Sequence, residues 1–425
     1  MTAALPGAPY LRRDLGTLCL DGVALDDLAG HYGTPLYVYS RGAMKAAVAA
    51  YQQALGSRRH LLCYALKANS NLAVLRLFAD AGCGFDIVSA GELARVMAIG
   101  VPGHRVVFSG VGKTAREMEA ALEARVRCFN VESTAELERL AQVAQAHGST
   151  ATVSLRVNPD VDARTHPYIS TGLRGNKFGI AHDAALDAYR RAADLPGLRV
   201  AGIDCHIGSQ IMQVEPFIDA LDRLLDLVEQ VETAGIAIEH IDVGGGLGIA
   251  YADEQPPDAG AMVTAMLGRL DARGHGHREV VLEPGRSLVG NAGVLLTEVQ
   301  YLKPGAERNF CVVDAAMNDL VRPAMYDAWM AIEPCQVRND EPERTWDVVG
   351  PVCESGDWLC RDRPLAVRAG DRLAILSAGA YGMVMSSNYN TRPRAAEVMV
   401  ENGRAALVRE RESVQALLQG ERDWV

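Results

Sequence analysis

The sequence predicts a (β/α)₈ barrel followed by a second, all-β domain. Between residues 60 and 286, eight short apolar runs alternate with amphipathic helical stretches. Repeated strand–helix units form parallel strands joined by right-handed crossovers. Eight such units close into a barrel, for which ~250 residues is the usual size. After Arg286 the runs are short and separated by Gly, Pro and Asp turns, which is typical of an all-β domain.

The barrel strands are expected at the apolar runs, and the helices at the amphipathic stretches between them. The expected strands are His60–Lys67, Gly84–Ser89, Arg105–Ser109, Arg127–Glu132, Thr152–Asn158, Val200–Ile207, His240–Gly244 and Val280–Glu283. The expected helices are Asn71–Ala81, Ala90–Ile99, Thr114–Glu123, Thr134–His147, Asp183–Asp194, Glu215–Ala234 and Ala259–Arg273. Ser133 is expected to cap the helix from Thr134, and Glu136 stands where a capping box needs it.

The second domain is expected to contain short strands with few helices between them. Its strand candidates are Leu295–Leu302, Asn309–Asp314, Thr345–Val349, Leu373–Leu376 and Ala405–Arg409. On this pattern residues 36–283 form the barrel, and residues 1–35 with 284–425 form the β-rich domain. The first 35 residues carry a short strand and a helical stretch, Leu25–Tyr32, which on pattern alone could complete either domain.

Composition excludes several classes of function. The net charge is −11 without a basic run, which argues against nucleic acid as the main partner. The chain has no apolar stretch near the ~20 residues that a membrane span needs, and residues 1–10 lack the features of a signal peptide. The nine cysteines are scattered, which is typical of reduced thiols. Without an H-E-x-x-H motif or a Cys/His cluster, we expect a cytoplasmic protein with no metal.

Lys67 closes a buried strand in Tyr64-Ala65-Leu66-Lys67-Ala68-Asn69. A lysine in this position is half desolvated, and burial favours its neutral form. A neutral amine can attack an aldehyde to form a Schiff base. The alternative is an ordinary surface lysine at a strand end, and this motif alone does not separate the two.

Other polar groups follow the barrel strands at the same end, where barrel enzymes carry their chemistry. They are Asp86, Arg156, His206, Ser209, Gly244-Gly245-Gly246, Glu283 and Arg286. The glycine triplet lets backbone N–H groups approach a phosphate, although such a triplet can also be a tight turn. His206 could be a core histidine or could lie against a flat cofactor.

Glu283 and Arg286 could form a structural ion pair or could have separate tasks. A carboxylate beside a pyridine nitrogen keeps that nitrogen protonated, which makes the ring an electron sink. The arginine could then bind a substrate carboxylate with its planar fork. An amine, a phosphate cradle, a stacking ring and a carboxylate together indicate pyridoxal 5′-phosphate as the cofactor.

These residues resemble the barrel-type pyridoxal phosphate enzymes, the alanine racemase-like group that includes the eukaryotic ornithine decarboxylases. The match is closest to the diaminopimelate decarboxylase family and covers nearly the whole chain. The matching motifs are Gly33-Thr34-Pro35-Leu36-Tyr37-Val38-Tyr39, Tyr64-Ala65-Leu66-Lys67-Ala68-Asn69, Asn176-Lys177-Phe178-Gly179-Ile180, His206-Ile207-Gly208-Ser209-Gln210, Asp242-Val243-Gly244-Gly245-Gly246, Glu283-Pro284-Gly285-Arg286, Met317-Asn318-Asp319-Leu320-Val321-Arg322-Pro323, Cys353-Glu354-Ser355-Gly356-Asp357 and Gly379-Ala380-Tyr381-Gly382.

The resemblance implies a role for each matching position. It implies catalytic roles for Lys67, which would hold the cofactor as a Schiff base, for Cys353, which would donate a proton, and for His206, which would stack on the ring. The implied cofactor-binding residues are Lys67, Asp86, His206, Ser209, Gly245, Gly246, Glu283, Gly285, Arg286 and Tyr381. The implied substrate-binding residues are Arg286, Arg322, Tyr326, Glu354 and Tyr381. Without the resemblance, Cys353 reads as a buried thiol, and Arg322 with Tyr326 reads as an exposed helix pair.

The activity that the resemblance implies is decarboxylation of meso-2,6-diaminopimelate to L-lysine and CO₂, the last step of lysine biosynthesis. It also implies a head-to-tail homodimer in which the Cys353-Glu354 segment completes the partner's site. The alternatives are a decarboxylase of ornithine, lysine, arginine or carboxynorspermidine, a racemase, and a non-catalytic homologue that binds the cofactor. Two arginines, Arg286 and Arg322, suit a substrate with a second carboxylate, and Glu283 argues against a racemase.

Overall fold

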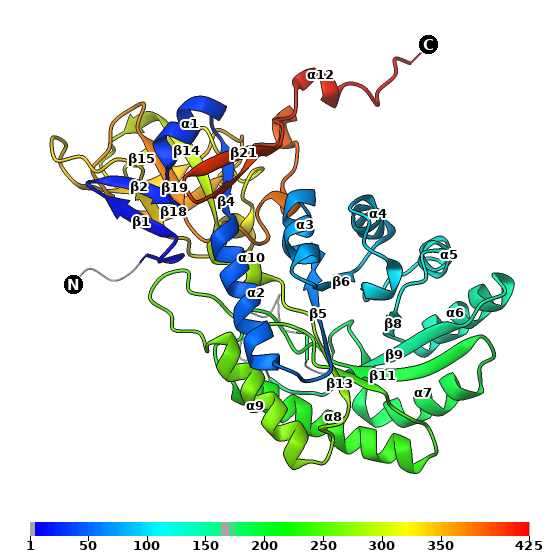
Figure 1. Cartoon of the computed structure of the whole chain (residues 1–425). Coiled ribbons are helices and arrows are strands. Elements are labelled where there is room, and N and C mark those ends of the chain that lie inside the picture. Colours follow the sequence, from blue (N-terminus) through cyan, green and yellow to red (C-terminus); the bar gives the residue numbers. More distant parts are fainter. Residues whose placement is uncertain (1–4, 163–170, 173–174, 425) are drawn as a thin grey trace. The chain divides into compact units, whose positions relative to one another are not determined.

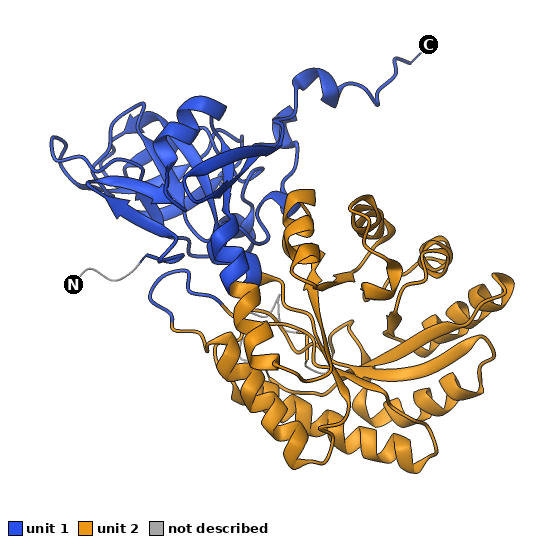
Figure 2. Ribbon diagram, viewed as in Figure 1, with its two compact units in different colours: residues 1–46, 249–254, 288–425 blue, residues 47–248, 255–287 orange. Residues whose placement is uncertain are grey.

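The computed structural model describes residues 5–162, 171–172 and 175–424. From its Gly, Thr and Arg content, the sequence Thr165–Asn176 is expected to form a mobile loop over the site, and most of it lies outside the described residues. The chain divides into two compact units (Figure 2). One consists of Met1–Ala46, Ile249–Glu254 and Leu288–Val425, and the other of Ala47–Gly248 and Gln255–Ser287. No helix of the described part is both long and apolar enough to cross a membrane.

The unit that contains Ala47–Gly248 is built on a closed barrel of eight parallel strands (Figure 1). In hydrogen-bonded order the strands are β9 (Ala151–Asn158), β11 (Leu198–Asp204), β12 (His240–Asp242), β13 (Glu279–Leu282), β5 (His60–Ala65), β6 (Gly84–Ile87), β7 (Val106–Phe108) and β8 (Cys128–Val131). β8 pairs again with β9, which closes the ring. β10 (Ile180–Ala181) is a short extra strand beside β9. The predicted (β/α)₈ fold and its eight strands are confirmed.

Helices connect the barrel strands, and each of the seven expected helices is present. They are α3 (Leu72–Asp80), α4 (Ala90–Ala98), α5 (Ala115–Glu123), α6 (Thr134–Ala146), α7 (His182–Asp194), α8 (Glu215–Thr233) and α9 (Ala259–Ala272). A further helix, α2 (Arg41–Leu55), was not predicted. Several helices start with a side-chain cap, such as Ser89 for α4 and Asp258 for α9. These caps satisfy backbone N–H groups that have no partner within the helix.

The start of α6 differs from the predicted capping box. Ser133 caps the helix as expected, since its Oγ accepts from the Glu136 backbone N at 3.2 Å. The Glu136 side chain does not return to the Ser133 backbone. Its Oε2 accepts from the Glu132 backbone N at 3.0 Å, and its Oε1 accepts from Lys113 Nζ at 2.7 Å. The complete capping box of this region is at α5, between Thr114 and Glu117.

Strand register brings three charged side chains to one level of the barrel. Arg156 on β9 is the Cα partner of Asp204 on β11, and Asp204 is the partner of Asp242 on β12. Partnered residues of parallel strands point to the same face of the sheet. All three side chains are buried, so they face the barrel interior near the carboxyl ends of their strands.

The other unit is built on a mostly antiparallel sheet around one long strand, β14 (Gly293–Lys303). The further strands are β4 (Leu36–Ser40), β15 (Phe310–Val313), β16 (Ile332–Pro334), β17 (Arg344–Val349), β18 (Trp358–Leu365), β19 (Arg372–Ile375), β20 (Ala396–Glu401) and β21 (Arg404–Arg409). The five predicted strands are confirmed, whereas β4, β16, β18 and β20 were not predicted. A separate small sheet contains β1 (Leu11–Asp14), β2 (Thr17–Leu20) and β3 (Val23–Ala24).

The N-terminal segment packs into the core of the sheet-containing unit. Leu25, Leu28 and Ala29 of α1 (Leu25–Tyr32) are buried in one cluster with Val294 and Leu296 of β14. β4 lies between β14 and β20, paired antiparallel with the first and parallel with the second. Burial of these apolar side chains supplies the driving force that joins the two distant parts of the chain.

Lys113 and Glu136 form a buried ion pair that links the start of α5 to α6. Lys113 Nζ also donates to the carbonyls of Gly110, at 2.8 Å, and Asn130, at 2.7 Å. We expect Lys113→Met to lower the free energy of unfolding by about 3–5 kcal/mol, because it leaves the Glu136 carboxylate buried without its cation. Urea unfolding followed by circular dichroism measures the loss. Lys303→Met, at an exposed lysine, is the control, and equal losses in both variants would contradict the assignment.

Candidate active site

Lys67 stands directly after β5, in the one-turn helix η1 (Leu66–Ala68). Its side chain is 37% exposed, so it is half-buried as expected. Its Nζ lies 2.8 Å from Oδ2 of the fully buried Asp86, which occupies β6 next to the end of β5. An adjacent carboxylate favours the charged form of an amine. The ion pair therefore acts against the neutral form that burial alone was expected to favour.

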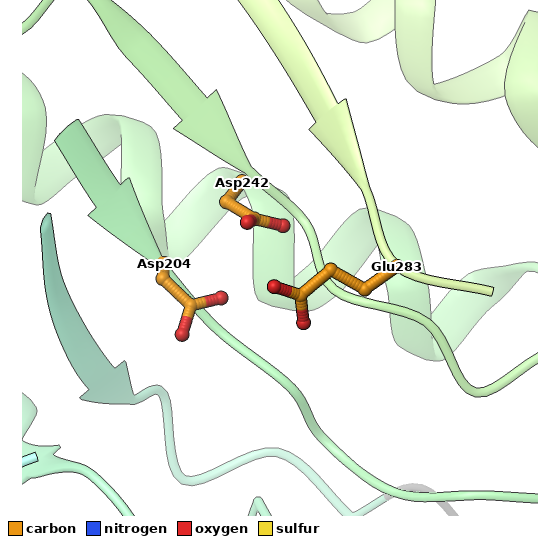
Figure 3. Close-up of side chains that lie close together, drawn as sticks. All are labelled: Asp204, Asp242 and Glu283. Carbon is orange, nitrogen blue, oxygen red and sulfur yellow. The ribbon is translucent and has the colours of Figure 1, made fainter. Parts of the chain in front are cut away.

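Three carboxyl groups gather in the barrel interior, on Asp204, Asp242 and Glu283 (Figure 3). Each offers an oxygen within 4.8 Å of the others. Burial is the main reason that the pKa values of Asp204 and Glu283 rise well above their usual range. Burial also raises the pKa of Asp242 to about 6, although a hydrogen bond from the Gly244 backbone N opposes the rise.

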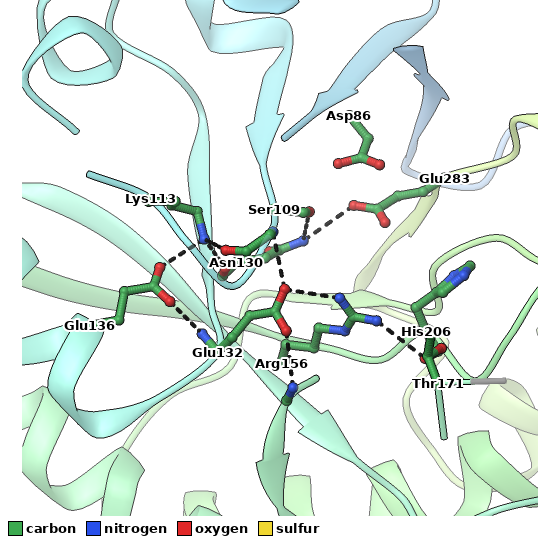
Figure 4. Close-up of polar contacts among 12 residues, drawn as sticks. Asp86, Ser109, Lys113, Asn130, Glu132, Glu136, Arg156, Thr171, His206 and Glu283 are labelled. Carbon is green, nitrogen blue, oxygen red and sulfur yellow. Dashed lines mark hydrogen bonds and ion pairs between the residues drawn. The ribbon is translucent and has the colours of Figure 1, made fainter. Parts of the chain in front are cut away.

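Asn130 holds the Glu283 carboxyl group in place (Figure 4). Its Nδ2 donates to Glu283 Oε1 at 3.2 Å and to Ser109 Oγ at 3.2 Å. Asn130 is on β8, and Ser109 directly follows β7. Glu283 is therefore oriented from the opposite wall of the barrel.

Glu132 and Arg156 connect their own two strand ends to three further segments at the same end of the barrel (Figure 4). Arg156 Nη1 donates to Glu132 Oε1 at 3.0 Å, and Arg156 Nη2 donates to the His206 carbonyl at 3.4 Å. The backbone N of Gly110 donates to Glu132 Oε1, and that of Gly179 donates to Oε2. This buried network fixes the backbone from which the His206 side chain extends.

His206 is held as a neutral ring with a defined tautomer. Burial is the main reason that its pKa falls well below 6.5, and the positive charges of Arg156 and Lys67 add to the effect. The Gly245 backbone N donates to its Nδ1 at 3.2 Å. Because Nδ1 is the acceptor, the ring proton resides on Nε2. A neutral imidazole next to Lys67 can lie against a flat ring without charge repulsion.

The glycine triplet forms a tight turn with no room for side chains. A Cβ at Gly245 would lie 2.2 Å from the Glu283 carbonyl oxygen, and one at Gly246 would lie 2.4 Å from that of Gly208. Gly246 also has a φ of +117°, which favours glycine. The turn follows β12, the seventh barrel strand, and barrels commonly hold phosphate at the loops after their seventh and eighth strands.

Arg286 contacts Ser209 beside this turn. Its Nε and Nη2 donate to Ser209 Oγ at 3.2 and 3.0 Å. The guanidinium group is thus next to the hydroxyl that was expected to bind phosphate. Gly285 approaches the start of the lysine segment, where a Cβ would come within 3.2 Å of Ala65 Cβ and 3.1 Å of Ala68 Cβ. An amine, a cationic phosphate cradle, a neutral ring and a buried acid form a donor set that fits pyridoxal phosphate.

The remaining predicted residues lie in the sheet-containing unit. Arg322 begins α11 (Arg322–Tyr326) and is buried, so it does not form the exposed helix pair that was the alternative interpretation. Its guanidinium lies 5.3 Å from the ring centre of Tyr251 and 5.6 Å from that of Tyr326. Tyr381 is half-buried with a φ of +54°, in a loop where a Cβ at Gly379 would clash with the Val289 carbonyl.

Cys353 and Glu354 lie on an exposed turn. Of the nine cysteines, Cys353 is the exposed one, which corrects its interpretation as a buried thiol. The Cys353 backbone N donates to Asn390 Oδ1 at 3.0 Å, and the Tyr389 hydroxyl donates to Glu354. Asp357 holds the turn, since its two oxygens accept from the backbone N atoms of Met317 and Val352, each at 2.7 Å.

Several residues of these arrangements were not nominated from the sequence: Glu132, Asn130, Asp204, Asp242, Tyr389 and Asn390. The signal available for Asp204 and Asp242 was their position at strand ends, immediately before Cys205-His206 and the glycine triplet. Asn130 and Glu132 likewise stand at the end of the fourth barrel strand, β8. Tyr389 contacts Glu354 and Asn390 contacts the Cys353 backbone through loop geometry that no sequence pattern indicates.

Comparisons with known proteins agree with this geometry. The family model described as the pyridoxal binding domain of pyridoxal-dependent decarboxylases matches residues 41–290. The diaminopimelate decarboxylase of Pseudomonas aeruginosa is 58% identical over 95% of this chain and 96% of its own length. That of Vibrio cholerae is 56% identical over 95% and 96%.

Solved structures show the same fold. Diaminopimelate decarboxylase from M. jannaschii in complex with L-lysine has a TM-score of 0.93 and 39% identity, with 98% of both chains covered. The Helicobacter pylori enzyme with L-lysine has a TM-score of 0.88 and 39% identity, covering 93% of this chain and 98% of the other. Lysine decarboxylase from Selenomonas ruminantium is more distant, at 0.80 and 26%, covering 89% and 95%. From the identities, the coverage and the matched cofactor domain, the chain belongs to the diaminopimelate decarboxylase family of pyridoxal-dependent decarboxylases.

Proposed function

We propose that the protein decarboxylates meso-2,6-diaminopimelate to L-lysine and CO₂, with pyridoxal phosphate as cofactor. The observation that carries the proposal is 58% identity to a diaminopimelate decarboxylase along nearly the whole chain. Two structural neighbours hold L-lysine, the product of this reaction. When bound, the cofactor supplies an aldehyde that takes an amine and a ring that accepts the electrons left by the departing CO₂.

The barrel residues have distinct tasks in this proposal. Lys67 holds the cofactor aldehyde, and Asp86 receives the proton that its ammonium group must lose. Gly245, Gly246, Ser209 and Arg286 bind the phosphate. The neutral ring of His206 packs against the cofactor ring, and Glu283 faces the ring nitrogen. These tasks are supported by the Lys67–Asp86 ion pair, the Arg286–Ser209 contact and the hydrogen bond that orients Glu283.

Substrate recognition is assigned to the sheet-containing unit. Arg322, buried between aromatic rings, binds a carboxylate together with Tyr326 and Tyr381, and Glu354 binds the distal ammonium group. Arg286 was also expected to bind substrate, but its contact with Ser209 supports a role at the phosphate. The choice of a substrate with a second carboxylate therefore rests on the comparisons.

Cys353 is the proposed proton donor to the substrate carbon. Its exposure together with Glu354 supports a site completed by a second copy of the chain in a head-to-tail homodimer. The expected domain boundary at residue 36 falls before β4, which pairs with β14 and β20 in the sheet-containing unit. We further infer that the unit of Ala47–Gly248 with Gln255–Ser287 binds the cofactor, that the sheet-containing unit supplies substrate and interface residues, and that the protein acts in the cytoplasm.

A substrate panel tests the activity. The purified protein with added cofactor should release CO₂ from meso-diaminopimelate at least tenfold faster than from L-ornithine or L-lysine, because those substrates lack the second carboxylate. Detection of CO₂ and of L-lysine by mass spectrometry measures both products. Faster turnover of L-ornithine would reassign the substrate, and racemised substrate without CO₂ would indicate a racemase.

Replacement of Lys67 tests its covalent role. Lys67→Ala should abolish turnover and the visible absorbance of the bound cofactor, while the circular dichroism spectrum stays unchanged, since the half-buried side chain adds little to the core. Lys303→Ala is the matched control and should keep both activity and absorbance. A variant that retains the visible band would place the cofactor on another amine.

Mixing two inactive variants tests whether sites are shared between chains. Lys67→Ala and Cys353→Ala should each be inactive alone. After the two are mixed and allowed to exchange subunits, roughly one quarter of wild-type activity should return, since half of the dimers are mixed and each contains one intact site. If Lys67 and Cys353 act within one chain, no activity returns.

A further inference from the structure

We propose that Asp204, Asp242 and Glu283 share at least one proton at neutral pH, and that Asp204 and Asp242 are positioning residues that set the charge of Glu283. We call these three residues the carboxyl triad. The inference deepens the proposed function, because Glu283 is the group assigned to the ring nitrogen. The sharing itself is a property of the protein alone, so it can be measured without cofactor or turnover.

Strand pairing brings the carboxyl triad together. Asp204 and Asp242 are Cα partners at the ends of β11 and β12. Glu283 directly follows β13, and its backbone N donates to the Gly244 carbonyl at 2.7 Å. Figure 3 shows the three carboxyl groups turned toward one another from three adjacent strands. All three are buried, with at most 5% of the residue exposed, so water does not screen their charges.

Two oxygens of the carboxyl triad have no hydrogen-bond partner among the described residues, Asp204 Oδ1 and Asp242 Oδ2. A buried polar atom without a partner is costly. The neighbouring donors are already engaged elsewhere on the triad, since the Gly244 backbone N donates to Asp242 Oδ1 and Asn130 Nδ2 donates to Glu283 Oε1. A proton on one carboxyl group would give an orphaned oxygen its missing partner.

The charged neighbours do not neutralise the carboxyl triad. The cations that act on it, Lys67 and Arg156, are each paired with another carboxylate, at 2.8 Å with Asp86 and at 3.0 Å with Glu132. No described lysine, arginine or histidine forms an ion pair with the triad itself. Three carboxylates within 4.8 Å would repel one another strongly in a buried site, and like charges in contact retain protons.

Apart from the ion-paired Lys67, Asp86, Arg156 and Glu132, the titratable groups around the carboxyl triad are neutral. Burial keeps His206 deprotonated and raises the pKa values of the buried thiols and of the Tyr189 phenol. The thiols concerned are those of Cys63, Cys128 and Cys205. Protons near neutral pH are therefore exchanged among the carboxyl groups, and their titration belongs to the triad as a whole.

A divalent cation is the competing occupant of these oxygens. Hard cations such as Mg²⁺ and Ca²⁺ take six or more oxygen ligands, whereas the carboxyl triad supplies three residues. Two of these residues already accept hydrogen bonds, Asp242 from the Gly244 backbone N and Glu283 from the Asn130 amide. Protons satisfy the same oxygens without further ligands. The geometry therefore favours shared protons, and elemental analysis of the purified protein decides between the two.

Infrared spectroscopy of the cofactor-free protein tests the proposal directly, because a protonated carboxyl group has its own C=O stretching band. The wild type should show this band at pH 7, and the double variant Asp204→Asn/Asp242→Asn should lose most of it. Asp314→Asn is the control and should keep the band, since Asp314 is not part of the carboxyl triad and its oxygens already accept three hydrogen bonds. Absence of the band from the wild type at pH 7 would overturn the proposal even if no variant folds.

Stability against pH gives a second readout. Raised folded pKa values mean that the native protein binds more protons than the unfolded chain, so stability falls as pH rises through the folded values. Between pH 5 and 8 the wild type should lose thermal stability more steeply than the double variant, whose melting temperature at pH 8 should be higher by about 2–4 °C. Parallel curves, or a stoichiometric metal ion whose removal by a chelator changes the band, would refute proton sharing. Failure of the substrate panel would leave both measurements intact.

Discussion

The parallel pairing that closes β8 onto β9 is the constraint on which the candidate site depends. Closure sets the level of each residue relative to its neighbours on the adjacent strands. Arg156, Asp204 and Asp242 therefore lie side by side through register alone, without any sequence proximity. A shift of one residue in any of these strands would turn its side chain out of the barrel, and the charged interior would lose its geometry.

A barrel interior with this many charges stays folded because nearly every charge has a counterpart. Lys67 is paired with Asp86, Arg156 with Glu132 and Lys113 with Glu136. Uncompensated buried charges would cost several kcal/mol each. The carboxyl triad is the exception among these groups, and it lies where a cationic ring nitrogen is proposed to bind. Negative charge is therefore available at the carboxyl triad, whereas the carboxylates of Asp86, Glu132 and Glu136 are neutralised by their cations.

The sequence predicted the strands and helices that apolar periodicity marks. It did not predict which hydrogen-bond partner a side chain takes when several are within reach. Alternating apolar runs located all eight barrel strands, but α2 was missed even though Ser40, whose Oγ accepts from the Ala43 backbone N at 3.0 Å, marks its start. Spacing alone predicted a capping box at Ser133, whereas Lys113 and the Glu132 backbone take the Glu136 carboxylate instead. The same limit applies to Arg286, which was assigned to both cofactor and substrate, because the contact of its guanidinium with Ser209 cannot be deduced from a motif.

The placement of β4 between β14 and β20 determines when this strand can pair during synthesis of the chain. Ribosomes release the chain from its N-terminus, so Leu36–Ser40 emerges long before either of its neighbouring strands. The complete barrel is synthesised in that interval and can fold first, as domains generally do during translation. Until Gly293 and the residues after it appear, the nascent protein exposes an apolar strand with both edges unpaired, a segment that chaperones would be expected to shield.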